Sequence, residues 1–183
     1  MHKATPRSGL HRLAAQDPAF ASPYWAYSWA GGLALARYVL DHPEIVRSRT
    51  VLDLGAGSGL VSIAAAKAGA ARVIAAEIDR HAATALALNA AENDVVIDIR
   101  HADLTGDAAP AVDIVLAGDL FYAADLAERV IRFLDRCVAA GAKVLIGDPW
   151  RADLPMARLT EVARYEVFET GSTPKPSAVF TFS

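Results

Sequence analysis

The fold of this chain is decided by the stretch Val51-Leu52-Asp53-Leu54-Gly55-Ala56-Gly57-Ser58-Gly59-Leu60. Its first four residues are apolar apart from Asp53 and predict a buried strand. The three glycines predict a tight turn, because glycine accepts positive φ angles and lets a ligand come close to the backbone. The apolar, alanine-rich residues after the turn predict a helix. A strand, a glycine-rich turn and a helix in this order are typical of nucleotide-binding α/β proteins.

The spacing of the glycines and the position of Asp53 indicate which nucleotide this turn binds. Turns that bind dinucleotides have the spacing G-x-G-x-x-G, and the helix that follows points its N-terminus at the pyrophosphate. Here the third glycine comes one residue early, and Asp53 stands two residues before the first glycine. A carboxylate at that place would repel pyrophosphate but suits a ligand with cationic groups. The pattern therefore favours S-adenosylmethionine, with its ammonium and sulfonium groups, over NAD.

Length and composition indicate one globular domain. The chain has 183 residues, of which 54% are hydrophobic and 21% charged, and this length is typical of a single domain with a substantial core. The net charge of −3 and the lack of a basic stripe argue against nucleic acid as a partner. The five histidines and the single cysteine, Cys137, show no metal-ligand spacing, so we expect no metal and no internal disulfide.

The sequence also predicts a soluble protein of the cytoplasm. No apolar run approaches the ~18 residues that cross a membrane, and the N-terminus lacks the apolar centre of a secretory signal. Residues 1–22 predict a basic arm with a short helix over 10–16. This arm contains Lys3, Arg7 and Arg12 but no acid before residue 17, a composition also found in transit peptides. Residues 23–183 are predicted to form the single domain.

Strands and helices alternate along the chain, which predicts an α/β fold. A mostly parallel sheet of seven strands with helices on both faces accounts for this order. The last two strands are joined by a turn too short for a helix, so we expect a C-terminal antiparallel β-hairpin and an edge strand that runs antiparallel. The predicted strands are 51–54, 72–76, 95–100, 112–117, 143–146, 161–170 and 177–182, and the predicted helices after residue 30 are 33–40, 60–68, 81–91 and 125–139.

Acidic residues stand at or near the ends of all five predicted parallel strands. Because ligands bind outside the carboxyl ends of strands in an open α/β sheet, we expect these acids to converge on one crevice. Their mutual repulsion calls for a cationic partner. The ordinary alternative for any one of them is a helix N-cap or an Asx turn, and it applies best to the acid followed by proline. The five acids are Asp53, Glu77, Asp103, Asp119 and Asp148.

The position of each acid predicts its role around S-adenosylmethionine. Asp53 is expected to hold the methionine portion, either directly or through backbone and water. Glu77 stands about twenty residues beyond the glycines, where an acid binds the ribose hydroxyls. Asp103 is placed to accept a hydrogen bond from the adenine amino group, and Asp119 remains for the acceptor substrate. The residues predicted to bind the cofactor are Trp29, Asp53, Gly55, Gly57, Ser58, Glu77, Asp103 and Asp119, of which Asp119 is predicted to serve the acceptor as well.

Four aromatic residues lie within the six residues 24–29. Trp25 and Trp29 are spaced i and i+4, so they either cover the end of the sheet as core residues or line the mouth of the cleft. In the second case their faces would favour a sulfonium or an ammonium. Tyr122 comes three residues after Asp119 and is expected to point into the same cleft. Cys137 falls on the apolar face of a predicted helix and is expected to fill the core.

Several of these stretches resemble a known enzyme family. Residues 52–59 resemble motif I of class I S-adenosylmethionine-dependent methyltransferases. Glu77 is similar to the acid at the end of the second strand of that fold, and the predicted terminal hairpin is similar to its antiparallel seventh strand. The resemblance implies a Rossmann-like seven-stranded methyltransferase sheet with S-adenosyl-L-methionine as cofactor.

Three further segments resemble one group within that family. Gly118-Asp119-Leu120-Phe121-Tyr122 resembles the D-x-x-Y signature of lysine-directed protein methyltransferases. Residues 23–38 and Gly147-Asp148-Pro149 resemble the electron transfer flavoprotein β-subunit lysine methyltransferases. The resemblance implies a monomeric protein-lysine N-methyltransferase acting on that subunit. Asp119 and Tyr122 are the implied catalytic residues, and Tyr122 and Trp29 would shape the acceptor channel.

Other functions remain open at this stage. Close relatives of the family are labelled as ribosomal protein L11 methyltransferases, so another protein is the first alternative acceptor. A small amine is the second. A non-catalytic nucleotide-binding protein on the same fold is a third possibility, which the intact acids disfavour.

Overall fold

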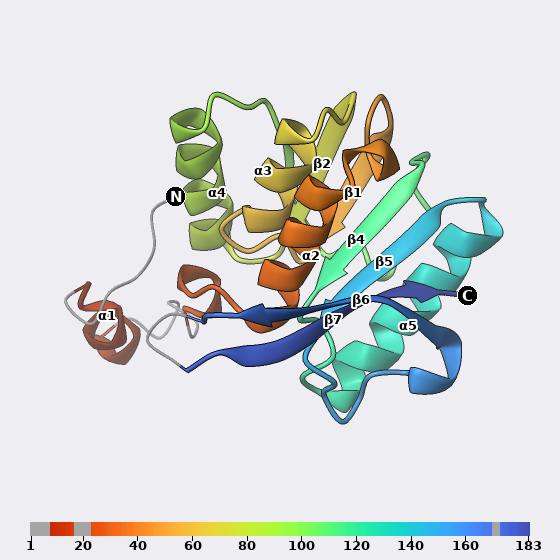
Figure 1. Ribbon diagram of the computed structural model, residues 1–183. Helices are drawn as coiled ribbons and strands as arrows, with labels where there is room; N and C mark the ends of the chain where they lie inside the picture. Colours follow the sequence, from red (N-terminus) through yellow and green to blue (C-terminus); the bar gives the residue numbers. More distant parts are fainter. Residues whose placement is uncertain (1–7, 17–22, 170–172) are drawn as a thin grey trace.

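A seven-stranded sheet forms the centre of the computed structural model, which describes residues 8–16, 23–169 and 173–183 (Figure 1). The strand order is β3-β2-β1-β4-β5-β7-β6. The first five strands run parallel, and β7 is antiparallel to both of its neighbours. The strands are β1 (Thr50–Leu54), β2 (Arg72–Glu77), β3 (Asp98–His101), β4 (Ile114–Gly118), β5 (Lys143–Asp148), β6 (Leu159–Val167) and β7 (Lys175–Phe182).

Helices cover both faces of this sheet (Figure 1). One apolar cluster joins α2 and α3 to alternate residues of the central strands, and a second joins α5 to the residues between them. Because both faces are covered, the central strands are apolar at consecutive positions. The helices are α1 (Leu10–Gln16), α2 (Ala30–Asp41), α3 (Leu60–Lys67), α4 (Arg80–Glu92) and α5 (Ala124–Ala139), with short 3-10 turns at η1 (Tyr24–Ala26), η2 (Pro43–Ile45) and η3 (Met156–Arg158).

The α/β fold, the mostly parallel sheet and the short N-terminal helix over 10–16 are confirmed. The rest of the predicted arm, residues 1–7 and 17–22, lies outside the described residues. The strand predicted at 95–100 begins only at Asp98. Val96 lies before it and is 94% exposed, so it is not part of the sheet. Among the described residues, no helix has the length and apolar character needed to cross a membrane.

The C-terminal hairpin is present, but the prediction of an antiparallel edge strand is wrong. The antiparallel strand β7 lies inside the sheet between β5 and β6, and the edge strand β6 runs in the direction of β1 to β5. The burial of the two strands explains this order. Residues 177–180 of β7 are buried, whereas most of β6 is exposed or half-buried. The more apolar strand takes the inner position, where both of its faces are covered.

The N-terminus of α2 rests directly on the carboxyl ends of β4 and β5. A Cβ atom built on Gly147 would overlap the carbonyl oxygen of Gly31, and one built on Gly31 would overlap the carbonyl oxygen of Gly147. A Cβ atom on Gly118 would lie 3.0 Å from the Cα atom of Gly32. Four glycines therefore bring helix and sheet backbones into contact. This contact also explains why α2 begins at Ala30 and not at residue 33, since the glycine pair belongs to the helix.

The substitution Gly147→Ala should destabilise the fold strongly. Its methyl group meets backbone atoms on a packed helix, which have little freedom to move, so we expect a loss of about 3 kcal/mol or more in the free energy of unfolding. Gly106→Ala is the matched control, because nothing lies within 4 Å of its Cβ position. Urea unfolding of both variants checks this prediction. Equal stability of the two variants would contradict it.

Candidate active site

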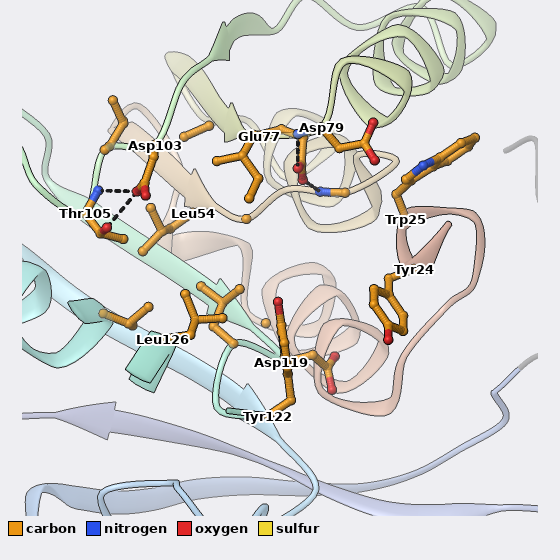
Figure 2. A pocket seen from close by; sticks show the side chains of 18 of the residues that line it. Tyr24, Trp25, Leu54, Glu77, Asp79, Asp103, Thr105, Asp119, Tyr122 and Leu126 are labelled. Carbon is orange, nitrogen blue, oxygen red and sulfur yellow. Dashed lines mark hydrogen bonds between the residues drawn. The ribbon is translucent and has the colours of Figure 1, made fainter. Parts of the chain in front are cut away.

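A cavity of about 840 Å³ opens at the carboxyl ends of the parallel strands (Figure 2). This volume lies in the range of small-molecule sites. The cavity is lined by the glycine turn, the ends of β2 and β4, the loop after β3, the aromatic segment before α2 and the start of α5. Among the predicted site residues, those that line it are Trp29, Gly55, Gly57, Glu77, Asp103, Asp119 and Tyr122.

The carboxylate of Glu77 holds the glycine turn in shape. Its Oε2 atom accepts a hydrogen bond of 2.7 Å from the backbone N–H of Gly57, and its Oε1 atom accepts one of 2.9 Å from the N–H of Asp79 (Figure 2). Gly55, Gly57 and Gly59 all have positive φ angles, which side chains rarely adopt. The turn therefore presents bare backbone to the cavity and carries a carboxylate at its edge.

Asp53 and Ser58 do not line the cavity. Asp53 is buried below the turn, where the hydroxyl of Ser62 donates a hydrogen bond of 2.5 Å to its Oδ2 atom. Burial raises the pKa of Asp53 to about 7, although the hydrogen bonds from Ser62 oppose this shift. The backbone carbonyl of Ser58 accepts a hydrogen bond of 2.9 Å from the Asn89 side chain. The structure therefore shows Asp53 bonded to Ser62 of α3 and not facing the cavity.

Asp103 lies at one end of the cavity and forms an Asx turn. Its Oδ1 atom accepts hydrogen bonds from the backbone N–H and the hydroxyl of Thr105, at 2.9 and 2.6 Å (Figure 2). Its Oδ2 atom accepts a bond of 2.8 Å from Arg129. The hydroxyl of Thr105 is the main cause that holds the pKa of this carboxyl below its usual value. Burial opposes this shift, and the backbone N–H of Thr105 and the charge of Arg129 add to it. This acid combines the ordinary turn role with a place at the cavity wall.

Asp119 caps helix α2 from the end of β4. Its two carboxylate oxygens accept hydrogen bonds from the backbone N–H groups of Gly31 at 3.1 Å and Gly32 at 2.5 Å. Arg151 donates a third bond of 2.5 Å to Oδ1. The side chain is only 10% exposed, and this burial raises the pKa of Asp119, while Arg151 and the helix amides oppose the rise. Its φ angle of 61° lies in the left-handed region, which aspartate tolerates better than most residues.

The five acids therefore do not all face one crevice. Glu77, Asp103 and Asp119 line the cavity, whereas Asp53 and Asp148 are buried behind its wall. The expectation that these acids await an external cation is also only partly correct, because the chain supplies Arg129 to Asp103 and Arg151 to Asp119 and Asp148. Among the described residues, no group of three or more His, Cys, Asp or Glu is arranged to hold a metal ion.

Three aromatic rings gather at the cavity. The ring centroid of Tyr24 lies 6.1 Å from that of Trp29 and 6.4 Å from that of Tyr122. The three side chains are 61%, 37% and 61% exposed, respectively, so they belong to the cavity mouth and not to the core. Trp25 lies over the glycine turn, with its Cα atom 3.8 Å from the Cβ position of Gly57. Its indole N–H is buried and has no hydrogen-bond partner among the described residues.

Comparison with known proteins identifies the family. Residues 35–144 match the family model described as ribosomal protein L11 methyltransferase (PrmA). The chain is 40% identical over 172 residues to the electron transfer flavoprotein beta subunit lysine methyltransferase of Xenopus laevis. The matched stretch covers 91% of this chain and 70% of that protein. This chain belongs to the electron transfer flavoprotein beta subunit lysine methyltransferase family. The human protein of the same name is 38% identical over 156 residues, 82% of this chain and 60% of its own length. The chain thus spans only part of the length of these relatives.

Solved structures share the fold of this lysine methyltransferase family member. One is the 16S rRNA N2 G1207 methyltransferase of T. thermophilus in complex with AdoMet and guanosine. It superposes with a TM-score of 0.62 at 23% identity and covers 85% of this chain and 43% of that one. The predicted seven-stranded methyltransferase fold is thereby confirmed.

Sequence reasoning missed several of the residues that line the cavity of this family member. Arg129, Arg151 and His101 all do so, and the Nε2 atom of His101 lies 2.9 Å from the carbonyl oxygen of Ile78. Arg129 is an exposed residue of α5, where arginine is ordinary. Arg151 follows a turn, where no periodicity applies. Cys137, by contrast, is buried as predicted, and burial raises the pKa of its thiol to about 11.

Asp53 should make stability depend on pH. Its folded-state pKa of about 7 lies above the ordinary value of 3.8, so the folded state keeps a proton that the unfolded chain loses between these pH values. Stability therefore falls as pH rises through this window, by up to about 1.4 kcal/mol per pH unit. Asp53→Asn has no carboxyl group to titrate at this position. Its free energy of unfolding, measured with urea and compared with that of the original chain, should therefore be more favourable at pH 8 than at pH 5. The exposed Asp107→Asn serves as control, and a pH-independent difference for Asp53→Asn would contradict the prediction.

Proposed function

We propose that this chain transfers methyl groups from S-adenosylmethionine to a lysine side chain of the electron transfer flavoprotein β-subunit. The observation that carries the proposal is the cavity itself, in which an exposed aromatic mouth leads to Asp119 beside the glycine turn. Membership of the lysine methyltransferase family supports the reaction, and the names of the relatives support the acceptor.

The residues of the cavity fit S-adenosylmethionine. The glycine turn offers backbone that a ligand can approach closely, and the carboxylate of Glu77 at its edge suits ribose hydroxyls. The buried indole N–H of Trp25 lacks a partner within the described chain, and a buried donor of this kind calls for an acceptor. The carboxylate of a bound methionine portion is such an acceptor. Asp103 is placed at the other end of the cavity, where it suits the adenine amino group.

S-adenosylmethionine, when bound, supplies a methyl group made electrophilic by its sulfonium, and transfer to the lysine Nζ atom leaves S-adenosylhomocysteine and a proton. The protein has to align the amine and help it to lose its proton, because an unperturbed lysine has a pKa of about 10.4. An ionised carboxylate has about four acceptor positions. In Asp119, three of these acceptor positions are used by hydrogen bonds from Gly31, Gly32 and Arg151. The remaining one is available to orient the lysine ammonium.

The aromatic mouth favours a cationic acceptor. The rings of Tyr24, Trp29 and Tyr122 form a partly exposed cluster, and ring faces attract ammonium groups. A long, flexible lysine side chain fits such an entrance, with its apolar stem against the rings. The open mouth also suits a folded protein better than a small amine, which usually requires an enclosed pocket.

Methyl-labelled S-adenosylmethionine tests the acceptor directly. The purified chain is incubated separately with electron transfer flavoprotein, with ribosomal protein L11 and with a small-molecule extract. Label on a lysine of the flavoprotein β-subunit is the expected result. Label on ribosomal protein L11 alone, or only in small molecules, would replace the proposed acceptor. Cofactor binding without any transfer would contradict the enzymatic proposal.

Asp119→Asn should abolish transfer while leaving cofactor affinity nearly unchanged. Asparagine tolerates the positive φ angle at this position and keeps one oxygen, but it lacks the charge that faces the lysine. We expect a loss of about 100-fold or more in kcat, in line with the removal of a proton-accepting group, and a Kd for the cofactor within about threefold. Asp107→Asn is the matched control. A large loss of cofactor affinity would show that Asp119 binds the cofactor and would contradict its proposed role toward the lysine.

Removal of the Tyr122 ring should weaken acceptor binding. Loss of one ring face costs about 1–2 kcal/mol of attraction for a cation, so Tyr122→Ala should raise KM for the protein substrate about 5- to 30-fold. Tyr122→Phe keeps the face and should stay close to the original KM. Steady-state kinetics with the flavoprotein checks both variants. If Phe were as damaging as Ala, the hydroxyl and not the ring face would be the important group.

A further inference from the structure

Arg151 connects two buried carboxylates at the wall of the cavity. Its Nη1 atom donates to Oδ1 of Asp119 at 2.5 Å and to Oδ2 of Asp148 at 3.0 Å. Its backbone N–H donates to Oδ1 of Asp148 at 2.7 Å. Asp148 is completely buried, Asp119 is 10% exposed and the Arg151 side chain is 22% exposed. The ends of β4 and β5 are therefore joined by one buried ion network.

The turn after β5 fixes the position of this arginine. Trp150 has a φ angle of 57°, so the chain reverses sharply between Asp148 and Arg151. The ring of Trp150 packs edge-on against Phe180 of β7, and the guanidinium of Arg164 from β6 lies 4.6 Å from the ring centroid. A non-glycine residue with positive φ is strained and persists only where its surroundings hold it. The C-terminal hairpin thus holds the turn that delivers Arg151 to Asp119.

The charges around Asp119 show why a cation is needed there. Asp148 faces it across Arg151, and Glu169 lies at the same helix terminus, where it accepts a bond of 3.1 Å from the N–H of Ala30 and pairs with Lys175. The backbone N–H groups of Gly31 and Gly32 stabilise the negative charge of Asp119. Glu77 and Tyr122 are the further titratable groups that line the same cavity near it. Burial and the negative charge of Asp119 both raise the pKa of Asp148. Burial also raises the pKa of Asp119. Arg151 opposes these effects at both carboxyls.

We infer that Arg151 is a positioning residue for methyl transfer, which keeps Asp119 ionised and aimed at the acceptor lysine while Asp148 fixes Arg151 in place. This inference rests on the proposed function of Asp119. A protonated Asp119 would donate a hydrogen bond where the lysine ammonium needs an acceptor. Without Arg151, two buried carboxyl groups would share one site with no cationic side chain bonded to either among the described residues, and at least one would hold a proton near neutral pH.

The first test follows the ionisation of Asp119 itself. Carboxyl carbons are labelled with 13C, the Asp119 signal is assigned by its loss in Asp119→Asn, and its chemical shift is followed by NMR as pH rises. Arg151→Met, which keeps an apolar stem without the charge, should move the titration of Asp119 to higher pH. Asp148→Asn, which removes the competing carboxylate, should move it to lower pH. An Asp119 titration that ignores both substitutions would overturn the inference.

The second test measures catalysis with the flavoprotein as substrate. At pH 7, Arg151→Met should reduce kcat about 10- to 100-fold and leave the cofactor Kd within about threefold. The ratio of variant to original kcat should rise between pH 7 and pH 9, as Asp119 becomes ionised again, and the ionisation of the lysine cancels from this ratio. Arg151→Lys should restore part of the activity, and Arg132→Met serves as an arginine control on the exposed face of α5. A loss of equal size at every pH, with no rescue by lysine, would indicate a merely structural role and overturn the inference.

The two proposals fail in different ways. If the original chain transfers no methyl group to any of the three acceptors, the proposed function fails, whereas the NMR titration still measures the effect of Arg151 on Asp119. If transfer occurs, the double variant Arg151→Met/Asp119→Asn should be no slower than Asp119→Asn alone, because Arg151 acts through Asp119. Additive losses would show that Arg151 acts by another route. If Arg151→Met does not fold, the NMR titration of Asp148→Asn still tests the inference, because that substitution should move the titration of Asp119 to lower pH.

Discussion

The backbone contact between the first turn of α2 and the ends of β4 and β5 is the constraint on which the candidate active site depends. Side chains at Gly31 and Gly147 would keep helix and sheet apart, so the contact exists only because both residues are glycine. The close approach brings the free N–H groups of the helix within reach of acids from the sheet. Asp119 satisfies two of them and Glu169 a third. The N-cap residue of this helix, Trp29, lines the cavity, although its side chain makes no capping bond.

This arrangement links parts of the chain that are distant in sequence. Asp119 follows β4, its partner Arg151 follows β5, and Glu169 follows β6, yet all three meet at one helix terminus. The terminal hairpin contributes the packing of Trp150 and so takes part in placing Arg151. A helix N-terminus stabilises negative charge, which makes it a suitable place to keep a buried carboxylate ionised. The positions of the aromatic residues follow as well, because the segment 24–29 enters the helix at this point.

Sequence reasoning predicted the fold well because the fold is encoded in local patterns. The apolar strands, the glycine turn and the amphipathic helix α5 are each visible within a few residues, and their order leaves few topologies. The position of β7 inside the sheet was missed because β6 and β7 are both plausible inner strands. Only their relative burial in the folded structure shows which of them lies inside. The cavity residues Arg129 and Arg151 were missed for a related reason. Their partners at the cavity wall, Asp103 and Asp119, lie 26 and 32 residues away in the chain, and no local spacing indicates such pairs.

The acids at the strand ends show most clearly what a sequence pattern leaves undetermined. All five were predicted to have one environment because they stand at or near the ends of five parallel strands. Depth in the structure separates them. Asp103 is exposed enough to keep its pKa low with a threonine and an arginine, whereas Asp53 lies below the turn and its pKa rises to about 7. Asp119 lies between these extremes, buried yet bonded to two amides and an arginine. The role proposed for Asp119 is to accept a hydrogen bond from a lysine ammonium, and this role fits the intermediate state. Full exposure would leave the carboxylate to water, and full burial would favour its neutral form.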